Sequence, residues 1–308
     1  MSVKFCFNLK TQKKAEPTEN GLYLKAEGGP TVLLIHGLTG TPNEMRFLAN
    51  FLNKKNYSVT CPRLVNHGEP LEILKKTKWQ EFYKSVRDVF YKLTQSHNGS
   101  PIFVAGLSMG ALLALLLADE FPEMIAGVIC LSPTLFYDGW NTPWSKHLLP
   151  IVCNTPLKHF LYFKEEPPYG IKNEAIRQRL HDYYQKADLN HLNGVAKYGY
   201  PYFPVALLSE LGLLIEHLKR KLPRIHIPVQ LIQAKEDDMT SVKNSQFVYD
   251  RICSKIKEIV LLENSYHVIT ADQERETVAE KMEQFMHRLS NGAYPKGVGE
   301  SRNAFATI

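Results

Sequence analysis

The sequence contains no run of apolar residues long enough to cross a membrane. Residues 1–19 are rich in lysine and lack the apolar core that a secretory signal requires. The five cysteines are odd in number and far apart, which argues against a disulfide framework. These absences favour a reducing compartment, and we expect a cytoplasmic protein.

The sequence also lacks a strong excess of charge of either sign. The 37 Lys and Arg residues exceed the 31 Asp and Glu residues only slightly, which gives a formal net charge of +6. This excess is compatible with a nearby anionic membrane surface but is too small and too diffuse to indicate nucleic-acid binding. The 11 histidines have no metal-ligand spacing, so we predict neither a metal site nor a cofactor.

The most informative segment that is present is the pentapeptide Gly106-Leu107-Ser108-Met109-Gly110. It follows the apolar run 102–105 and precedes the helix-like run 111–117, so the expected order is strand, sharp turn and helix. In this context a G-x-S-x-G turn is a nucleophile elbow, in which two glycines allow the backbone to hold the serine hydroxyl above the sheet. Ser108 is therefore the candidate nucleophile.

A serine hydroxyl needs a base to accept its proton, and the base needs a carboxylate to orient it. The chain supplies both downstream, as the acidic turn Glu236-Asp237-Asp238 and then His267. The turn follows the strand-like run 229–234, and His267 follows the strand-like run 258–262. Because open α/β sheets place their chemistry at the carboxyl ends of the strands, we expect these residues and Ser108 to meet at one edge.

An oxyanion hole would complete this site, because backbone N–H groups stabilise the negative oxygen of a tetrahedral intermediate. The residue after the nucleophile, Met109, supplies the first expected donor. The second is the N–H of Leu38, in the loop 36–40 that follows the strand-like run 31–35.

Periodicity along the chain predicts a mostly parallel sheet with helices on both faces, and no internal repeat. The expected strands are 22–25, 31–35, 58–61, 102–106, 128–132, 229–233 and 256–262, and the expected helices are 42–55, 79–96, 109–121, 241–253 and 271–289. Residues 1–136 and 222–290 form the predicted core. Residues 137–221 are a predicted cap inserted over the site, with helices at 174–186 and 206–219, and we expect residues 291–308 to be mobile.

The predicted cap is rich in aromatic residues. We select Trp140, Trp144 and Phe203 as candidates to line an apolar acyl-binding pocket or to rest on a lipid interface. The alternative is that the aromatic side chains form a small core of the cap itself.

In five segments the chain resembles the α/β-hydrolases, and more closely the small bacterial carboxylesterases and monoacylglycerol lipases. The matching segments are residues 34–40, Asn66-His67-Gly68, 106–110, 233–239 and 265–274. The resemblance implies an α/β-hydrolase fold with a helical cap. It also implies that Asp237, three residues beyond Ala234, is the triad acid, although many α/β-hydrolases have glycine at the position of Ala234. It is weak across the cap, so substrate preference does not transfer.

The resemblance and the residues together predict a serine hydrolase that cleaves short- to medium-chain carboxylic esters or monoacylglycerols through an acyl-enzyme on Ser108. A lysophospholipase or thioesterase is the alternative within enzymes, and acyl transfer to another alcohol is open. A non-catalytic receptor on the same fold is the alternative from another class. The expected partner is a small ester or lipid, with transient membrane-surface contact through the cap and no nucleic acid.

Overall fold

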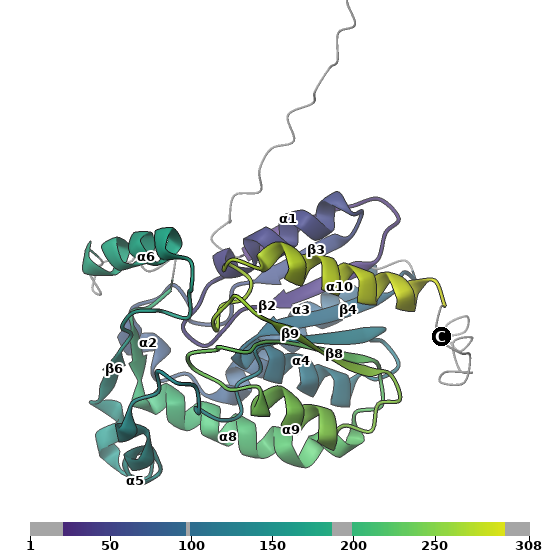
Figure 1. Cartoon of the computed structure of the whole chain (residues 1–308). Helices are drawn as coiled ribbons and strands as arrows, with labels where there is room; N and C mark the ends of the chain where they lie inside the picture. Colours follow the sequence, from purple (N-terminus) through teal and green to yellow (C-terminus); the bar gives the residue numbers. More distant parts are fainter. Residues whose placement is uncertain (1–20, 97–98, 187–198, 293–308) are drawn as a thin grey trace, which may run out of the picture.

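The computed structural model describes residues 21–96, 99–186 and 199–292 (Figure 1). The predicted mobile tail therefore lies almost wholly outside the described residues. In the part of the chain that is described, no helix has the length and apolar character needed to cross a membrane.

One seven-stranded sheet forms the centre of the molecule. In spatial order its strands are β1 (Gly21–Leu24), β3 (Ser58–Pro62), β2 (Thr31–Ile35), β4 (Ile102–Leu107), β5 (Gly127–Leu131), β8 (Val229–Ala234) and β9 (Lys257–Leu262). Only β1 pairs antiparallel with its neighbour, and the other pairs are parallel. The sequence places all seven strands to within one residue at each end, which confirms the predicted mostly parallel sheet.

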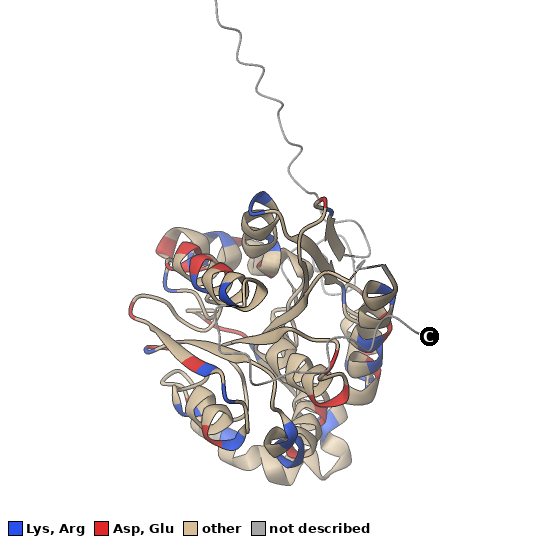
Figure 2. Ribbon diagram, turned by 90° about the vertical axis from the view of Figure 1, so that its right-hand side faces the viewer, with Lys and Arg blue, Asp and Glu red and all other residues tan. Residues whose placement is uncertain are grey.

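Helices cover both faces of the sheet. They are α1 (Arg46–Lys54), α2 (Leu71–Leu74), α3 (Trp79–Ser96), α4 (Met109–Glu120), α8 (Val205–Lys221), α9 (Lys243–Arg251) and α10 (Arg275–Ser290). Figure 1 shows α1 and α10 on one face and α4, α8 and α9 on the other. Figure 2 shows that charged residues gather on the helices, whereas the strands in the middle of the sheet are almost free of them.

The apolar core is divided by the sheet because successive side chains of a strand point to opposite faces. In β2, Leu33 and Ile35 pack into one cluster with α3, α4 and α8, while Val32 and Leu34 pack into the other with α1 and α10. Because helices cover both faces of the sheet, both sets of side chains on a central strand are buried, and such a strand is a continuous run of apolar residues.

Helix α4 is apolar on every side and is buried from Met109 to Ala118. A helix of this composition must be covered all round. The sheet covers one side and α8 packs against another, with Leu207, Leu211, Leu214 and Leu218 of α8 in the same apolar cluster as α4. The sequence of α4 therefore fixes the segment after Ser108 rigidly in the core.

The segment between β5 and β8 contains the predicted cap. Its elements before α8 are η2 (Trp144–Leu148), α5 (Leu149–Cys153), η3 (Pro156–His159), β6 (Tyr162–Lys164), α6 (Glu174–Lys186) and β7 (Tyr202–Pro204). Strands β6 and β7 pair antiparallel in a second, two-stranded sheet. Helix α8, assigned to the cap by the sequence, packs on α4, and the division into core and cap stays a prediction.

The helix predicted at 271–289 begins four residues later, at Arg275. Residues before it form a turn in which the Asp272 carboxylate accepts the backbone N–H of Tyr266 and the Glu274 carboxylate accepts that of Asn264. Carboxylates that bond locally to the backbone compete with helix formation, which explains the later start.

Candidate active site

Ser108 lies at the sharp turn between β4 and α4, with a positive φ of 57°. Two glycines make this turn possible. A Cβ on Gly106 would overlap the backbone of Gly110, and a Cβ on Gly110 would overlap the carbonyl oxygen of Ile35 on β2. The backbone N–H of Ser108 donates to the carbonyl of Leu131 on β5 over 2.9 Å. The sharp turn predicted from the pentapeptide is present.

The hydroxyl of Ser108 hydrogen-bonds to the hydroxyl of Thr134, with 2.9 Å between the two oxygens. Thr134 is almost fully buried and lies just beyond the end of β5, the strand next to β4. The sequence offers no motif that would have identified this partner.

Asp237 is buried and its carboxylate is saturated with donors. Oδ1 accepts the backbone N–H groups of Met239 and Thr240 over 2.9 and 2.8 Å, and Oδ2 accepts Gln233 Nε2 over 2.7 Å and the Thr240 hydroxyl over 3.0 Å. Oδ2 also lies 2.9 Å from Nδ1 of His267. These donors fix both oxygens of the Asp237 carboxylate in one orientation.

His267 is buried with its two ring nitrogens in different environments. Nδ1 faces Asp237, while Nε2 has no hydrogen-bond partner among the described residues. Burial lowers the pKa of His267, but the charges of Asp237, Asp238 and Glu44 outweigh burial, so the pKa is raised overall. The Asp237 carboxylate therefore holds the ring at Nδ1, whereas Nε2 forms no hydrogen bond with the described residues.

The other two carboxylates of the acidic turn have different partners. Asp238 is buried, which raises its pKa, and it accepts the backbone N–H groups of His267 and Gly170 over 3.2 Å each. Glu236 forms an ion pair with Lys172, 2.5 Å apart. Of the three acids, only Asp237 contacts the imidazole ring of His267.

Two histidines hold the loop that carries Leu38. Nε2 of His36 accepts the backbone N–H of Leu64 over 3.1 Å, and Nε2 of His67 donates to the carbonyl of Leu38 over 2.7 Å. Burial lowers the pKa of His36 well below its ordinary value and lowers the pKa of His67 to about 4. Both rings are thus neutral and hold the loop through their hydrogen bonds.

The two predicted oxyanion donors flank the elbow. Met109 follows Ser108 at the start of α4, and Leu38 follows Gly37, whose N–H donates to Glu44 Oε1 over 2.5 Å. Within the described ranges, no hydrogen bond occupies the N–H of Leu38 or of Met109.

The aromatic candidates are spread over the predicted cap. Trp140 lies beside the histidine loop, which is the segment 263–274 that carries His267. Its Nε1 donates to the carbonyl of Glu236, and its ring packs edge-on against Tyr266 at 5.4 Å. Trp144 is 77% exposed, and Phe203 on β7 is partly buried against the main core. Only Trp140 is tied directly to the loops that carry Asp237 and His267.

Sequence reasoning missed four polar residues around the site: Thr134, Glu44, Glu165 and Asp272. Glu165 follows β6, and burial together with the charge of Asp238 raises its pKa to about 8. The carboxylate of Asp272 accepts the backbone N–H groups of Lys172 and Asn173 over 2.7 and 2.9 Å. Asp272 belongs to the matching segment 265–274, which was the one available signal.

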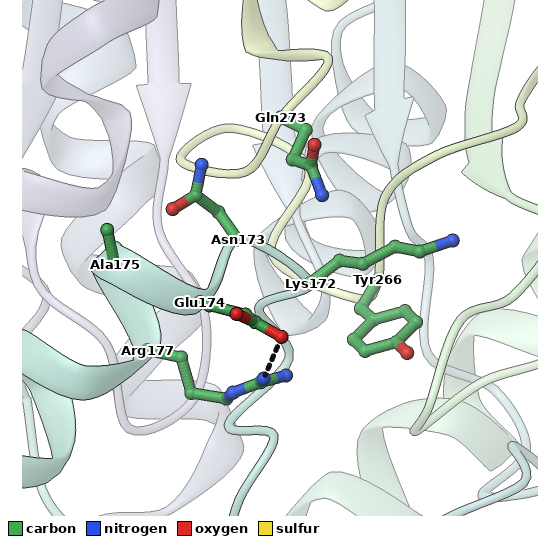
Figure 3. A pocket seen from close by; sticks show the side chains of 7 residues that line it. All are labelled: Lys172, Asn173, Glu174, Ala175, Arg177, Tyr266 and Gln273. Atoms are coloured by element: carbon green, nitrogen blue, oxygen red, sulfur yellow. Dashed lines mark ion pairs between the residues drawn. The ribbon is translucent and has the colours of Figure 1, made fainter.

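A polar pocket of about 560 Å³ opens beside the histidine loop (Figure 3). It lies between the start of α6 and the segment around Tyr266, and Figure 3 shows the ion pair that Arg177 forms with Glu174 at its rim. The residues that line it are Lys172, Asn173, Glu174, Ala175, Arg177, Tyr266 and Gln273.

Comparison with known proteins agrees with the α/β-hydrolase fold. Residues 27–274 match the model of a family described as serine aminopeptidase S33. The chain is 32% identical over 261 residues to a thermostable monoacylglycerol lipase of Bacillus sp. (strain H-257), covering 84% of this chain and 92% of the relative. It is 25% identical over 262 residues to a carboxylesterase of Bacillus subtilis (strain 168), covering 85% and 94%.

Among solved structures, a metagenome-derived lipolytic enzyme superposes with a TM-score of 0.70 at 27% identity, covering 90% of this chain and 98% of the other.

Proposed function

This chain belongs to the family described as serine aminopeptidase S33 and has the α/β-hydrolase fold of lipases and esterases, and from this premise we propose which residues carry its chemistry. It is a carboxylic ester hydrolase. We assign Ser108 as the nucleophile, His267 as the base and Asp237 as the acid that orients it. The N–H groups of Leu38 and Met109 form the oxyanion hole.

The reaction proceeds in two acyl-transfer steps. Nε2 of His267 takes the proton of the Ser108 hydroxyl while Oγ attacks the carbonyl carbon of the ester. The carbonyl oxygen becomes negative and accepts hydrogen bonds from Leu38 and Met109. When the tetrahedral intermediate collapses, the bond to the alcohol breaks and the alcohol leaves with the proton from His267. Water, deprotonated by His267, then attacks the acyl-enzyme; the bond from the acyl carbon to Ser108 Oγ breaks, His267 returns the proton to Oγ, and the acid is released.

The observation that carries this assignment is the environment of His267. Its Nδ1 lies 2.9 Å from a carboxylate that four other donors hold in place, and its buried Nε2 is left open among the described residues. An imidazole held in this way is in the tautomer that accepts a proton at Nε2. A purely structural histidine would be expected to have both nitrogens bonded.

For the substrate we propose short- to medium-chain esters or monoacylglycerols. The relative at 32% identity is named a monoacylglycerol lipase, and the segment between β5 and β8 supplies the aromatic side chains that an acyl chain would contact. A lysophospholipase, a thioesterase, acyl transfer to another alcohol and a non-catalytic receptor remain the alternatives.

The test is a substrate panel on the full chain. It contains p-nitrophenyl esters from acetyl to palmitoyl, a monoacylglycerol, a lysophosphatidylcholine, an acyl-CoA and an aminoacyl p-nitroanilide. We expect ester turnover by the wild type and none by Ser108→Ala. A higher kcat/KM for the lysophosphatidylcholine or for the acyl-CoA would instead favour a lysophospholipase or a thioesterase. Ligand binding without any turnover would favour the receptor.

The neighbouring carboxylates Asp237 and Asp238 allow the same substitution to be compared at the proposed triad acid and beside it. Asp237→Asn should lower kcat by about 10⁴-fold, because the amide favours the wrong tautomer of His267. Asp238→Asn should have a much smaller effect, since Asp238 accepts the backbone N–H groups of His267 and Gly170 and does not bond to the imidazole ring. Equal losses in the two variants would contradict the assignment of Asp237.

We also propose that the segment 144–161 rests on a lipid surface. Trp144, Ile151 and Phe160 are 77%, 67% and 74% exposed, and the basic residues Lys146 and Lys158 lie among them. Large exposed apolar side chains interspersed with cations suit an anionic bilayer interface.

Co-sedimentation with phosphatidylglycerol vesicles tests this contact. Trp144→Ser with Phe160→Ser should weaken sedimentation and leave hydrolysis of a soluble acetyl ester intact. Met124→Ser removes an exposed apolar side chain outside the segment and is the control. Equal sedimentation by all three proteins would contradict the proposal.

The cytoplasm stays the proposed location. The described cysteines are free, and Cys61 and Cys130 are buried, as expected for thiols in a reducing compartment. Cell fractionation of the tagged full chain would test it.

A further inference from the structure

Glu44 places a carboxylate inside the loop that carries the proposed oxyanion donor Leu38. It belongs to the short helix η1 (Pro42–Met45), which starts immediately after this loop. Oε1 accepts the backbone N–H of Gly37 over 2.5 Å. A Cβ on Gly40 would overlap Oε2, so the carboxylate lies directly against the backbone of Gly40. The loop from Gly37 to Gly40 is folded around this one side chain.

The same carboxylate lies close to the nucleophile. A Cβ built on Gly37 would be 3.4 Å from Glu44 Oε1 and 3.6 Å from the Cβ of Ser108. Gly37 therefore separates Glu44 from Ser108 by the thickness of one backbone segment. A side chain at this distance from the reacting atoms can act on them through both geometry and charge.

The geometric effect concerns the peptide that contains the Leu38 N–H. Glu44 holds the N–H of Gly37 on one side of the loop, and His67 holds the carbonyl of Leu38 on the other, over 2.7 Å. With both neighbouring groups bonded, rotation of the peptide between Gly37 and Leu38 is restricted. A preorganised donor of this kind needs no reorientation when the oxyanion forms.

The electrostatic effect concerns His267. Burial raises the pKa of Glu44 to about 7, while the Gly37 N–H and His267 oppose that rise. In return, the negative charge of Glu44 raises the pKa of His267. The other titratable groups that interact with Glu44 are Cys61 on β3 and Glu165 and Tyr184 from the segment between β5 and β8.

We propose that Glu44 is a positioning residue for ester hydrolysis, which orients the Leu38 N–H through Gly37 and stabilises His267 when the ring takes the proton of Ser108. This inference rests on the proposed function. In the step concerned, the proton moves from Ser108 Oγ to His267 Nε2 as the bond from Oγ to the carbonyl carbon forms. Glu44 exchanges no atom and acts only on the groups that do.

The experiment compares Glu44→Ala, which removes the acceptor, with Glu44→Gln, which keeps an acceptor oxygen and removes the charge. Glu280→Gln is the matched control, because it makes the same change in net charge at an exposed position on α10. kcat and KM for a soluble p-nitrophenyl ester are measured across the pH range.

Glu44→Ala should lower kcat by about 10- to 100-fold with KM nearly unchanged. The reason is that a misplaced Leu38 N–H weakens the hydrogen bond to the oxyanion, which forms mainly in the transition state. Glu44→Gln should keep more of kcat, and the acid limb of its kcat/KM profile should move to lower pH because His267 loses a stabilising charge. Glu280→Gln should match the wild type. Wild-type kcat in Glu44→Ala would overturn the positioning role, and an unmoved acid limb in Glu44→Gln would overturn the charge effect.

A second measurement does not depend on activity. In protein labelled with ¹⁵N-glycine, the Gly37 amide proton should resonate far downfield, titrate with Glu44 and shift upfield in Glu44→Ala, because a charged acceptor strengthens the hydrogen bond. An amide spectrum that is identical in the variant would overturn the contact. If wild type turns over no ester, the proposed function fails, and this spectrum still decides whether Glu44 holds the loop.

Discussion

The hydroxyl oxygens of Ser108 and Thr134 lie 2.9 Å apart, whereas Nε2 of His267 has no partner in the described part of the chain. The Ser108 hydroxyl is thus bonded to a buried neighbour just beyond the end of β5 and not to the base that would activate it. If Ser108 is the donor of this pair, its hydroxyl must turn from Thr134 to His267 before attack.

Thr134→Val should raise the acylation rate. The substitution keeps the shape of the side chain and removes the competing hydroxyl, and one net hydrogen bond of about 1 kcal/mol corresponds to about a fivefold change in population. The burst phase with a p-nitrophenyl ester measures it. Thr134→Ser keeps the hydroxyl and should match the wild type, while a slower burst in Thr134→Val would mean that Thr134 supports the attack.

Gly110→Ala should destabilise the fold by about 3 kcal/mol, because its Cβ would overlap backbone atoms of Ile35 and His36 that cannot move freely. Gly212→Ala on α8 is the comparison, since no heavy atom lies within 4 Å of its Cβ position. That variant should gain about 0.5–1 kcal/mol from better helix propensity. Urea unfolding distinguishes the two, and equal stabilities would contradict the close approach at the elbow.

Asp272→Ala should lower both stability and kcat. Its buried carboxylate accepts the backbone N–H groups of Lys172, Asn173 and Tyr266, and Tyr266 precedes His267. Three N–H groups would lose their acceptor, which should cost about 3 kcal/mol of unfolding free energy. Asp272→Asn keeps one acceptor oxygen and should fall between Ala and wild type. An alanine variant with wild-type kcat would show that the histidine loop holds its position without Asp272.

The free energy of unfolding should decrease at acidic pH because of His67. Its pKa is about 4 in the fold, against 6.5 for an ordinary histidine, so between these values the unfolded chain binds a proton that the folded chain does not. The stabilisation is therefore complete above pH 6.5 and decreases towards pH 4, by about 3 kcal/mol in all. Urea unfolding across this window should show a weaker decline for His67→Gln than for wild type or for the exposed control His287→Gln. An unchanged decline would point to His36 or other groups.

Much of the fold could be predicted because its signals are local. Seven apolar runs gave the strands, and the helices α3 and α6 begin and end where the periodicity places them. The helix α10 starts four residues late because Asp272 and Glu274 bond to the backbone of the loop before it, which the helical periodicity of the sequence does not record.

Within the site, the sequence by itself determined the chemical types and their order. Ser108, the acidic turn and His267 each follow a strand, and parallel strands bring their carboxyl ends to one edge of the sheet. That physical constraint is enough to predict that these residues approach one another.

Only the tertiary structure decided which atoms meet. It directs Asp237 to the imidazole, gives Asp238 to the backbone of His267, and sets Thr134 beside the nucleophile across adjacent strands. Side-chain direction at a strand end depends on hydrogen bonds from residues far apart in the chain. A linear sequence records the residue types that meet at this edge, whereas the packing of β4, β5, β8 and β9 sets the distances between their atoms.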